Sequence, residues 1–178
     1  DASLAGSSRF DWAGWAVASA GDVNADGYDD LLVGVPYLDK GGSNVGAVFL
    51  LLGPVSGELS FEDADAQIVG EDDYDAAGRV VGSAGDVDGD GLGDFIVGAP
   101  DRSQVGTNAG AAYLVLGPVD GGLDLGSADA RMVGEAAHDA AGGAVAGAGD
   151  VDGDGLDDLV VGAATNDRGG SDAGAAYL

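Results

Sequence analysis

The sequence repeats itself at a fixed period of 64 residues, and this period restricts the possible folds more than any other feature. An offset of 64 aligns residues 21–23 with 85–87 and 149–151, and residues 46–50 with 110–114 and 174–178, without a gap. A regular period of this length indicates stacked or radial units, each too small to bury a hydrophobic face alone. We therefore treat 1–178 as a single segment with repeats 1–64, 65–128 and a truncated 129–178.

Each period contains four short apolar runs, which we name A to D, separated by turn residues. In the first repeat they are 15–20, 30–34, 46–52 and 66–70. Four such runs are the content of a four-stranded antiparallel blade. The 35 glycines argue against a helical bundle, because each interior Gly costs a helix roughly 1 kcal/mol relative to Ala. We predict an all-β fold of about three β-propeller blades, in which Ala and Gly in runs A and C allow close approach near a central axis.

The order of the runs predicts an incomplete ring. Residues 1–6 align with 65–70, a D run, so the chain reads D, then A to D twice, then A to C. Leu178 aligns with the middle of run C, so the sequence stops within an element. Three blades are too few for a propeller, which typically has four to eight. We expect oligomerisation or a longer native chain to complete the ring, with an N-terminal D strand covering the open edge of the last blade.

An Asp-rich loop of nine residues joins runs A and B in every repeat: 22–30, 86–94 and 150–158. Ca²⁺ prefers six to eight oxygen ligands at about 2.3–2.6 Å, which side chains at loop positions 1, 3, 5 and 9 and a backbone carbonyl at position 7 can supply. Gly at position 6 allows the sharp turn. The candidate ligands are Asp22, Asn24, Asp26, Tyr28, Asp30, Asp86, Asp88, Asp90, Leu92, Asp94, Asp150, Asp152, Asp154, Leu156 and Asp158.

Several alternatives to three calcium sites can be weighed from the loop sequence. An EF-hand needs Glu at position 12, where this chain has Val33, Val97 and Val161 inside a strand. A metal-free Asp/Gly turn explains one such loop, but three copies holding three, four and four carboxylates would be strongly repulsive without cations. Mg²⁺ prefers water ligands and strict octahedral geometry. We therefore expect Ca²⁺ as the cofactor, bound at three sites.

The net charge excludes some partners. The chain has 32 acidic and six basic residues, a formal charge of −26, whereas binding to nucleic acid requires Lys and Arg to neutralise phosphates. A generally acidic, salt-adapted surface is an alternative source of this charge, but it does not explain the regular Asp spacing. There is no Cys to supply a thiolate ligand. The longest apolar stretch, 47–52, is far shorter than the roughly 20 residues that membrane insertion by a helix requires.

These motifs resemble the FG-GAP repeats of the integrin α-subunit β-propeller. The resemblance is carried by residues 12–14, the Asp loop, and residues 32–36 and 46–50. The second repeat has the full Gly98-Ala99-Pro100 motif, the third lacks its Pro at Ala164, and no repeat has Phe before the "FG" glycine. The resemblance implies a Ca²⁺-stabilised propeller, seven-bladed in the family, that serves extracellular or cell-surface adhesion or ligand recognition. No signal peptide is recognisable at Asp1.

Catalytic residues are not evident in the sequence. The only histidine, His138, aligns with Phe10 and Tyr74, so we expect it to fill an aromatic packing position. Asp11, Asp75 and Asp139 recur once per repeat, as expected of structural hydrogen-bonding residues rather than one catalytic site. We predict that the protein is not an enzyme. The alternatives are a propeller appended to a secreted polysaccharide-active or lipid-active enzyme, and a structural or engineered repeat fragment that assembles into a closed ring.

Antiparallel strands place the A–B and C–D connections at one end of each blade and the B–C and D–A connections at the other. The second group contains the basic residues Lys40, Arg102, Arg168 and Arg9 and the aromatic residues Phe10, Trp12, Tyr37 and Tyr74. Aromatic residues and Arg are enriched in binding interfaces. We predict that a protein or glycan ligand binds at this end, opposite the calcium loops. The alternative is that Phe10, Trp12 and Tyr74 wedge between adjacent blades.

Overall fold

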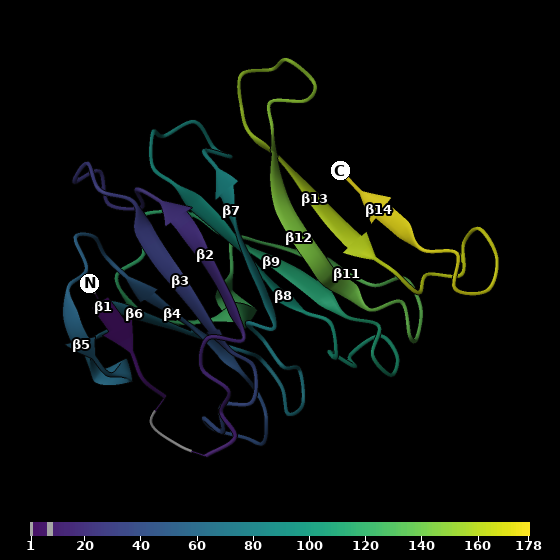
Figure 1. Cartoon of the computed structure of the whole chain (residues 1–178). Coiled ribbons are helices and arrows are strands. Elements are labelled where there is room, and N and C mark those ends of the chain that lie inside the picture. Colours follow the sequence, from purple (N-terminus) through teal and green to yellow (C-terminus); the bar gives the residue numbers. More distant parts are fainter. Residues whose placement is uncertain (1, 7–8) are drawn as a thin grey trace.

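A computed structural model describes residues 2–6 and 9–178, and its regular elements are almost entirely strands (Figure 1). The strands are β1 (Ala2–Leu4), β2 (Ala16–Gly21), β3 (Asp30–Val35), β4 (Ala47–Leu51), β5 (Gly57–Leu59), β6 (Ala66–Val69), β7 (Val80–Gly85), β8 (Asp94–Ala99), β9 (Ala111–Val115), β10 (Gly121–Asp124), β11 (Ala130–Val133), β12 (Ala141–Gly149), β13 (Asp158–Ala163) and β14 (Ala175–Tyr177). Two 3₁₀ turns, η1 (Phe61–Asp63) and η2 (Leu125–Ser127), complete the list. Among the described residues, no helix has the length and apolarity needed to cross a membrane.

The strands form three antiparallel sheets that correspond to the three repeats. The first blade has the order β2-β3-β4-β6, the second β7-β8-β9-β11 and the third β12-β13-β14. Equivalent residues pair in each blade, such as Val17 with Val33 and Val81 with Val97. The sheets lie side by side, with the two termini on opposite sides of the molecule (Figure 1). The predicted all-β, blade-like architecture is confirmed, and the three blades alone do not form a closed ring.

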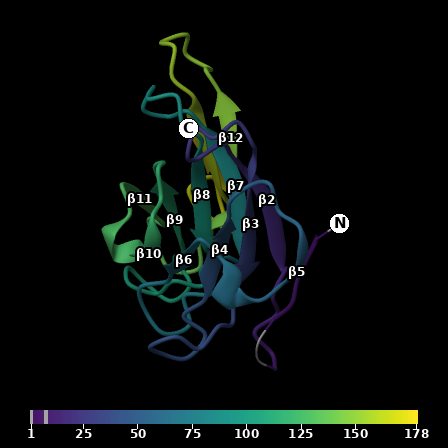
Figure 2. The same ribbon diagram turned by 90° about the vertical axis from the view of Figure 1, so that its left-hand side faces the viewer.

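Short parallel strands in the C–D connections were not predicted from the sequence. In the second blade, β10 of this connection pairs with β6 of the preceding blade, with Gly121 opposite Ala66 (Figure 2). In the first blade, β5 pairs in the same way with β1, with Gly57 opposite Ala2. The two pairings have the same register at the 64-residue offset. Relative to the first blade, β1 therefore occupies the position of the D strand of a preceding blade.

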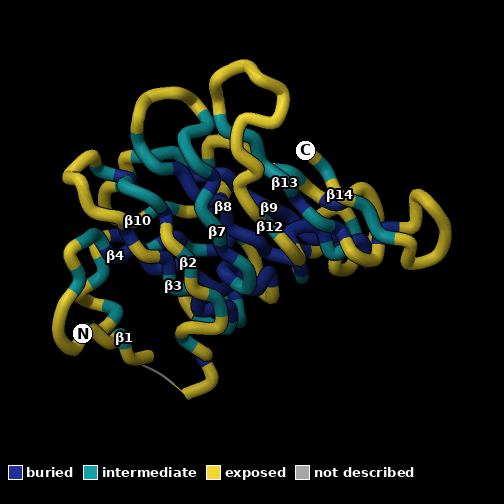
Figure 3. Tube along the Cα trace, turned by 45° about the horizontal axis from the view of Figure 1, so that its top comes forward, coloured by how far each residue is buried: buried dark blue, intermediate teal, exposed yellow. Residues whose placement is uncertain are grey.

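The main hydrophobic core lies between neighbouring blades rather than inside one blade. Its buried residues from the first blade include Leu32, Val48, Leu50 and Ile68, and those from the second include Phe95, Val97, Tyr113 and Val115. A smaller cluster around Ile96 and Val161 joins the second and third blades. Figure 3 shows buried strand segments where the sheets face one another and exposed chain at the outer loops. Each blade thus depends on its neighbours for burial, as the repeat period suggested.

Glycines in the B strands allow the backbones of adjacent blades to approach closely. A Cβ atom at Gly34 would overlap the carbonyl oxygen of Gly78, and one at Gly98 would overlap that of Gly142. Just before the C strand β4, a Cβ atom at Gly46 would meet the backbone of Ala77. The sequence predicted close approach near a central axis, in runs A and C. The structure shows close approach in both runs, for example at Gly147 beside Ala84 and at Gly46 beside Ala77, and it adds run B. The place of these contacts near a central axis stays a prediction.

The predicted separation of the connections into two ends is confirmed. At one end, the backbone N–H of Gly53 in the C–D connection donates to the Asp30 side chain of the Asp loop at 2.8 Å. At the other end, the N–H of Tyr74 in the D–A connection donates to the carbonyl of Ser43 in the B–C connection at 2.9 Å. The Asp loops therefore lie far from the predicted ligand-binding end.

Candidate metal centres

The three Asp loops connect the A and B strands of each blade: β2 with β3, β7 with β8, and β12 with β13. The glycine at loop position 6 has a φ of 89° at Gly27, 88° at Gly91 and 95° at Gly155. These values lie in a region that side chains with a Cβ rarely adopt. The expected sharp turn at this glycine is present in all three loops.

Backbone N–H groups hold the carboxylates of the second loop in place. Asp86 accepts hydrogen bonds from the N–H groups of Gly89 at 2.8 Å and Gly91 at 3.0 Å. Asp88 accepts one from the N–H of Asp90 at 3.1 Å. These bonds orient the side chains at positions 1 and 3 before any ligand arrives, as a binding site requires.

The third loop has the same internal hydrogen bonds. Asp150 accepts from the N–H groups of Gly153 at 2.7 Å and Gly155 at 3.1 Å. Asp152 accepts from the N–H of Asp154 at 3.0 Å. The two loops therefore share one local structure.

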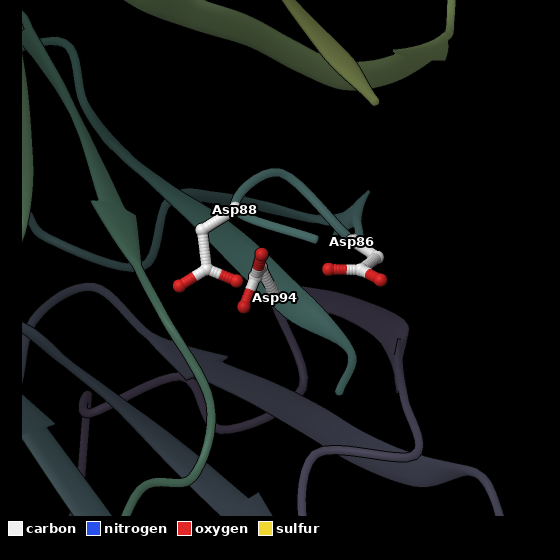
Figure 4. Close-up of side chains that lie close together, drawn as sticks. All are labelled: Asp86, Asp88 and Asp94. Atoms are coloured by element: carbon white, nitrogen blue, oxygen red, sulfur yellow. The ribbon is translucent and has the colours of Figure 1, made fainter. Parts of the chain in front are cut away.

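Three carboxylates converge in each of these loops. In the second, oxygens of Asp86, Asp88 and Asp94 lie within 4.8 Å of one another, and Figure 4 shows the three side chains extending toward one another. In the third loop, Asp150, Asp152 and Asp158 form the equivalent group. Like charges this close repel each other, and an all-oxygen donor set suits Ca²⁺. In the second and third loops, the structure thus brings together the residues predicted as ligands at positions 1, 3 and 9.

The residues at positions 5 and 7 lie outside these groups. The position 5 carboxylates accept hydrogen bonds from the N–H groups of the position 7 residues. These bonds join Asp26 to Tyr28 at 2.9 Å, Asp90 to Leu92 at 2.8 Å, and Asp154 to Leu156 at 2.9 Å. Metal ligation by positions 5 and 7 stays a prediction.

The first loop has the same turn with one fewer carboxylate. Asp22 accepts from the N–H of Gly27 at 2.8 Å, and the Asn24 amide oxygen accepts from the N–H of Asp26 at 3.0 Å. The Asn24 amide nitrogen also donates to Asp26 at 3.1 Å. Asn24 therefore takes over the structural role of Asp88 without its charge.

The position 9 aspartate has a second role that sequence reasoning missed. Asp94 is fully buried and accepts from the N–H of Val87 at 2.7 Å and from that of Gly117 at 2.9 Å. Asp30 makes the same pair of bonds, with Gly53 as the second donor. The aspartate therefore ties the Asp loop to the C–D connection. The sequence feature that could have indicated this contact is the Gly-Pro pair that follows run C, at residues 53–54 and 117–118.

Burial raises the pKa of Asp94, since an ionised carboxylate loses solvation inside the protein. The N–H groups of Gly117 and Val87 oppose this shift, and the nearby carboxylates of Asp88 and Asp90 add to it. A bound cation would favour the ionised form of all three. Negative charge is thus concentrated around Asp94.

Adjacent Asp loops are joined by hydrogen bonds across the blade interface. The N–H of Gly93 donates to the carbonyl of Asp22 at 2.8 Å, and the N–H of Asp157 donates to the carbonyl of Asp86 at 3.1 Å. The Asp157 carboxylate also accepts from the N–H of Asp86 at 2.9 Å. Position 8 of one loop therefore contacts position 1 of the preceding loop. This contact could not be predicted from the repeat, because position 8 alternates between Asp and Gly.

One residue of the predicted ligand-binding end is not available to a ligand. Arg102 is only 1% exposed; it pairs with Glu71 and lies 3.6 Å from the carboxylate of Asp75. Glu71 also pairs with Arg131 at 2.6 Å. The prediction that Arg102 belongs to a partner surface was wrong. A buried guanidinium needs carboxylate partners, and the D–A connection supplies them to Arg102 inside the protein.

The remaining predicted residues of that end are accessible to differing degrees. Lys40, Arg9 and Arg168 are exposed. Phe10, Tyr74 and His138, which are equivalent in the three repeats, are all exposed and have φ values between 67° and 71°. His138 therefore does not fill an aromatic packing position as predicted, and Phe10 and Tyr74 are not buried between blades.

An aromatic group unique to the first repeat lies at the same end. Trp12 and Trp15 stack with ring centroids 5.1 Å apart, and Tyr37 meets Trp12 edge-on at 5.0 Å. Both Trp side chains are about half exposed. The second repeat has Arg79 in place of Trp15 and Asp101 in place of Tyr37, and these two form an ion pair at 2.6 Å.

The recurring aspartates before each A strand are buried and structural, as predicted. Asp75 accepts from the N–H of Asp72 at 3.1 Å, and Asp139 accepts from the N–H of Ala136 at 2.8 Å. Asp11 is also buried. Burial raises the pKa of Asp75 to about 6, while the Asp72 N–H and Arg102 act in the opposite direction.

Comparison with known proteins agrees with this architecture. The family model described as "FG-GAP repeat" matches residues 13–51, 77–115 and 141–178, together more than half of the chain. The protein named integrin alpha pat-2 is 39% identical over 83 residues in both Caenorhabditis briggsae and Caenorhabditis elegans. The match covers 46% of this chain and 7% of either relative. The three repeats and their blade structure thus agree with the family model, and the chain belongs to the FG-GAP repeat family.

Proposed function

We propose that this chain is a calcium-binding propeller module for extracellular adhesion or ligand recognition, in which Ca²⁺ is structural and no reaction is catalysed. The observation that carries the proposal is the convergence of three carboxylates in each of two Asp loops. The first loop, with Asp22, Asn24 and Asp30 at the same positions, supplies the third site. Integrin-like FG-GAP repeats provide the family context.

Electrostatics support a bound cation in these loops. Two carboxylates about 4 Å apart repel by about 1 kcal/mol in bulk water and by about 4 kcal/mol near a protein surface. Each loop holds at least two such groups and the molecule carries a charge of −26. Hydrogen bonds from the loop backbone already orient Asp86 and Asp88. A divalent cation therefore relieves repulsion at little cost in ordering.

The ligand chemistry favours Ca²⁺ over other metals. The grouped ligands are carboxylate oxygens, and the sequence contains no Cys and a single His. Such hard oxygen donors suit Ca²⁺ and Mg²⁺, and Mg²⁺ prefers to retain several waters. With the ion enclosed by protein oxygens, its role is to hold the A and B strands together.

The recognition function is proposed for the end opposite the Asp loops, with a protein or glycan as the partner. Exposed Phe10, Tyr74, Lys40 and Arg168 remain candidates there, while buried Arg102 does not. Exposed aromatic side chains combine large contact area with few rotatable bonds, as binding surfaces require. The comparison with cell-surface integrin α proteins supports an extracellular location.

Calcium titration by isothermal calorimetry tests the metal proposal. We expect three Ca²⁺ ions per chain, and the loss of one after Asp86→Asn combined with Asp94→Asn. The matched control is Asp120→Asn, which removes an exposed charge outside the loops. A wild-type chain without saturable binding, or an unchanged stoichiometry in the double variant, would refute the assignment of these sites.

The recognition proposal needs a separate test. Immobilised wild-type protein is screened against extracellular matrix proteins and neutral glycans, beside Phe10→Ala combined with Tyr74→Ala. A partner that binds wild type and is lost by this variant, but is retained by Val151→Ala at an exposed apolar residue of the Asp-loop end, supports the proposed end. Equal binding by the two variants would place the partner elsewhere.

A further inference from the structure

The junction between the second and third Asp loops differs from the junction between the first and second. At both junctions, the N–H at position 8 of one loop donates to the carbonyl at position 1 of the preceding loop, from Gly93 to Asp22 and from Asp157 to Asp86. Only Asp157 has a side chain, and its carboxylate also accepts from the N–H of Asp86 at 2.9 Å. Asp157 therefore holds both the N–H and the carbonyl of Asp86.

A glycine leaves the space that this carboxylate occupies. A Cβ atom at Gly85, directly before Asp86, would overlap the Asp157 carboxylate. At the equivalent position of the first blade, a Cβ atom on Gly21 would meet only the Cα atom of Gly93, at 3.4 Å. The Asp157 carboxylate thus packs against the backbone of the second loop, and it is not one of the three carboxylates grouped there.

A second contact joins the same two loops. A Cβ atom at Gly89, position 4 of the second loop, would lie 2.9 Å from the Cδ2 atom of Leu156 in the third loop. Leu156 and Asp157 are consecutive, so one short segment of the third loop contacts positions 1 and 4 of the second.

Within its own loop, Asp157 lies between two candidate metal ligands. Leu156 precedes it and is the predicted position 7 ligand, with its N–H donating to Asp154 at 2.9 Å. Asp158 follows it and belongs to the carboxylate group of the third loop. With a cation in the third loop, the backbone would be held on both sides of Asp157.

We propose that Asp157 is a positioning residue for the metal site of the preceding loop, and that the second and third sites consequently bind Ca²⁺ with positive cooperativity. Once the third loop is ordered, Asp157 fixes the backbone of Asp86, so the second site loses less conformational freedom on binding. Linkage makes the effect reciprocal. Coupling between the first and second loops should be smaller, because Gly93 offers only its N–H. The inference rests on the calcium binding proposed above.

Substitutions of Asp157 separate its hydrogen bond from its charge. Asp157→Ala removes the carboxylate and should weaken the second site by about fivefold, at the lower end of common coupling factors. Asp157→Asn keeps an oxygen that can accept from the N–H of Asp86 and should bind nearly as tightly as wild type. Gly93 shows that a loop forms without a side chain at position 8. The matched control is Asp29→Ala, at position 8 of the first loop, which should leave the second site unchanged.

Amide NMR resonances report each loop separately. The N–H groups of Gly27, Gly91 and Gly155 each donate to the position 1 carboxylate of their own loop. Titration in calcium-buffered solutions therefore gives a dissociation constant for each loop. Hydrogen exchange of the Asp86 N–H in chelating buffer reports the contact without metal, and it should be faster in Asp157→Ala than in wild type.

A double-mutant cycle tests the cooperativity itself. Asp152→Asn weakens the third site and should keep its turn, because Asn24 makes the same backbone hydrogen bond in the first loop. In the otherwise wild-type chain, this substitution should also weaken the binding that Gly91 reports. In the Asp157→Ala chain, it should leave that binding unchanged.

A further pair of variants displaces the carboxylate without removing it. Gly85→Ala places a Cβ atom where the Asp157 carboxylate lies, whereas Gly21→Ala does not. The two glycines have φ values of 86° and 79°, so the backbone strain of the substitutions is matched. Gly85→Ala should weaken the second site more than Gly21→Ala weakens the first. Equal losses would assign the effect to strain and count against the positioning role.

The outcomes separate this inference from the proposed function. Three loops that bind Ca²⁺ with the same affinities in wild type and in Asp157→Ala overturn the positioning role and leave the calcium sites standing. An Asp157→Asn chain as weak as Asp157→Ala assigns the effect to charge and overturns it as well. No response of Gly91 and Gly155 to Ca²⁺ refutes the proposed function, and this inference with it.

Discussion

At position 3 of the Asp loops, the chain carries its own natural substitution: Asn24 in the first loop stands where Asp88 and Asp152 stand in the others. The amide oxygen of Asn24 and the carboxylate of Asp88 accept the same backbone hydrogen bond, at 3.0 and 3.1 Å. Exchanging these side chains therefore changes charge while keeping the turn.

Asp88→Asn should weaken one of the three proposed calcium sites by about tenfold, and Asn24→Asp should strengthen another by a similar factor, because ligand charge tunes Ca²⁺ affinity. Calorimetric titration of each variant checks both directions. The exposed Asp120→Asn serves as a control for general charge effects. Unchanged affinities in both exchanged loops would show that position 3 does not contact the ion.

The buried Asp75 gives the stability a pH dependence of its own. Its pKa is raised to about 6, above the value of an unfolded chain, so the folded state holds this proton more tightly. The stabilisation from this group is fully present below about pH 4 and is lost as the pH rises through about 6. Ionised Asp75 is therefore a source of instability at neutral pH.

Asp75→Asn should remove this pH dependence, because an amide does not titrate. The amide oxygen can still accept the hydrogen bond from the N–H of Asp72. Between about pH 5 and about pH 7, wild type should lose about 1 kcal/mol of unfolding free energy relative to the variant. Urea unfolding in a chelating buffer checks the difference without interference from metal binding at the proposed sites. A gap that stays constant with pH would contradict the assignment.

The spacing of residues in the sequence predicted which loop carboxylates can lie close together. It did not predict which residues at the opposite end are buried. The loop ligands are close in sequence, so spacing alone indicated that Asp86, Asp88 and Asp94 can meet, and the structure groups them. Arg102 gave the wrong prediction because its partner Glu71 lies 31 residues away, in the connection between two blades. Burial of this kind depends on packing between segments that are far apart in the sequence, which no local pattern reveals.

At the scale of elements, the four strands of a blade could be predicted because alternating turns and apolar runs mark each one. The observed β2, β3, β4 and β6 agree with the predicted runs to within one residue at their first residues. The short strands β5 and β10 could not be found this way. They have three and four residues, and they form only because a neighbouring D strand lies beside them.

The close packing of blades leaves no room for a side chain at Gly98. Gly98→Ala should destabilise the fold by about 1–3 kcal/mol, the usual range for overpacking, because the new Cβ atom would overlap the carbonyl of Gly142. Gly162→Ala, at the same place in the third blade, meets only the Ala144 side chain at 3.2 Å and should cost less. Urea unfolding of both variants, beside wild type, checks the contrast. Equal costs would contradict the proposed interblade contact.

For the molecule as a whole, the largest hydrophobic core lies between blades, and the Asp loops join those blades at one end. A cation in a loop would therefore stabilise both a single blade and its junction with the next blade. It would fix the A and B strands of one blade, and through the contact of Asp157 with Asp86 it would also stiffen the junction with the next. Metal binding should consequently be coupled to folding.

The most direct test of this account is the melting temperature measured in a chelating buffer, in millimolar Ca²⁺ and in millimolar Mg²⁺. An ion present at about 100 times its dissociation constant stabilises a folded protein by about 2.7 kcal/mol per site. For a chain of this size that is roughly 5–10 °C per site. We predict a low melting temperature with chelator, recovery with Ca²⁺, and a smaller recovery with Mg²⁺. A melting temperature indifferent to chelator and to Ca²⁺ would contradict the central claim.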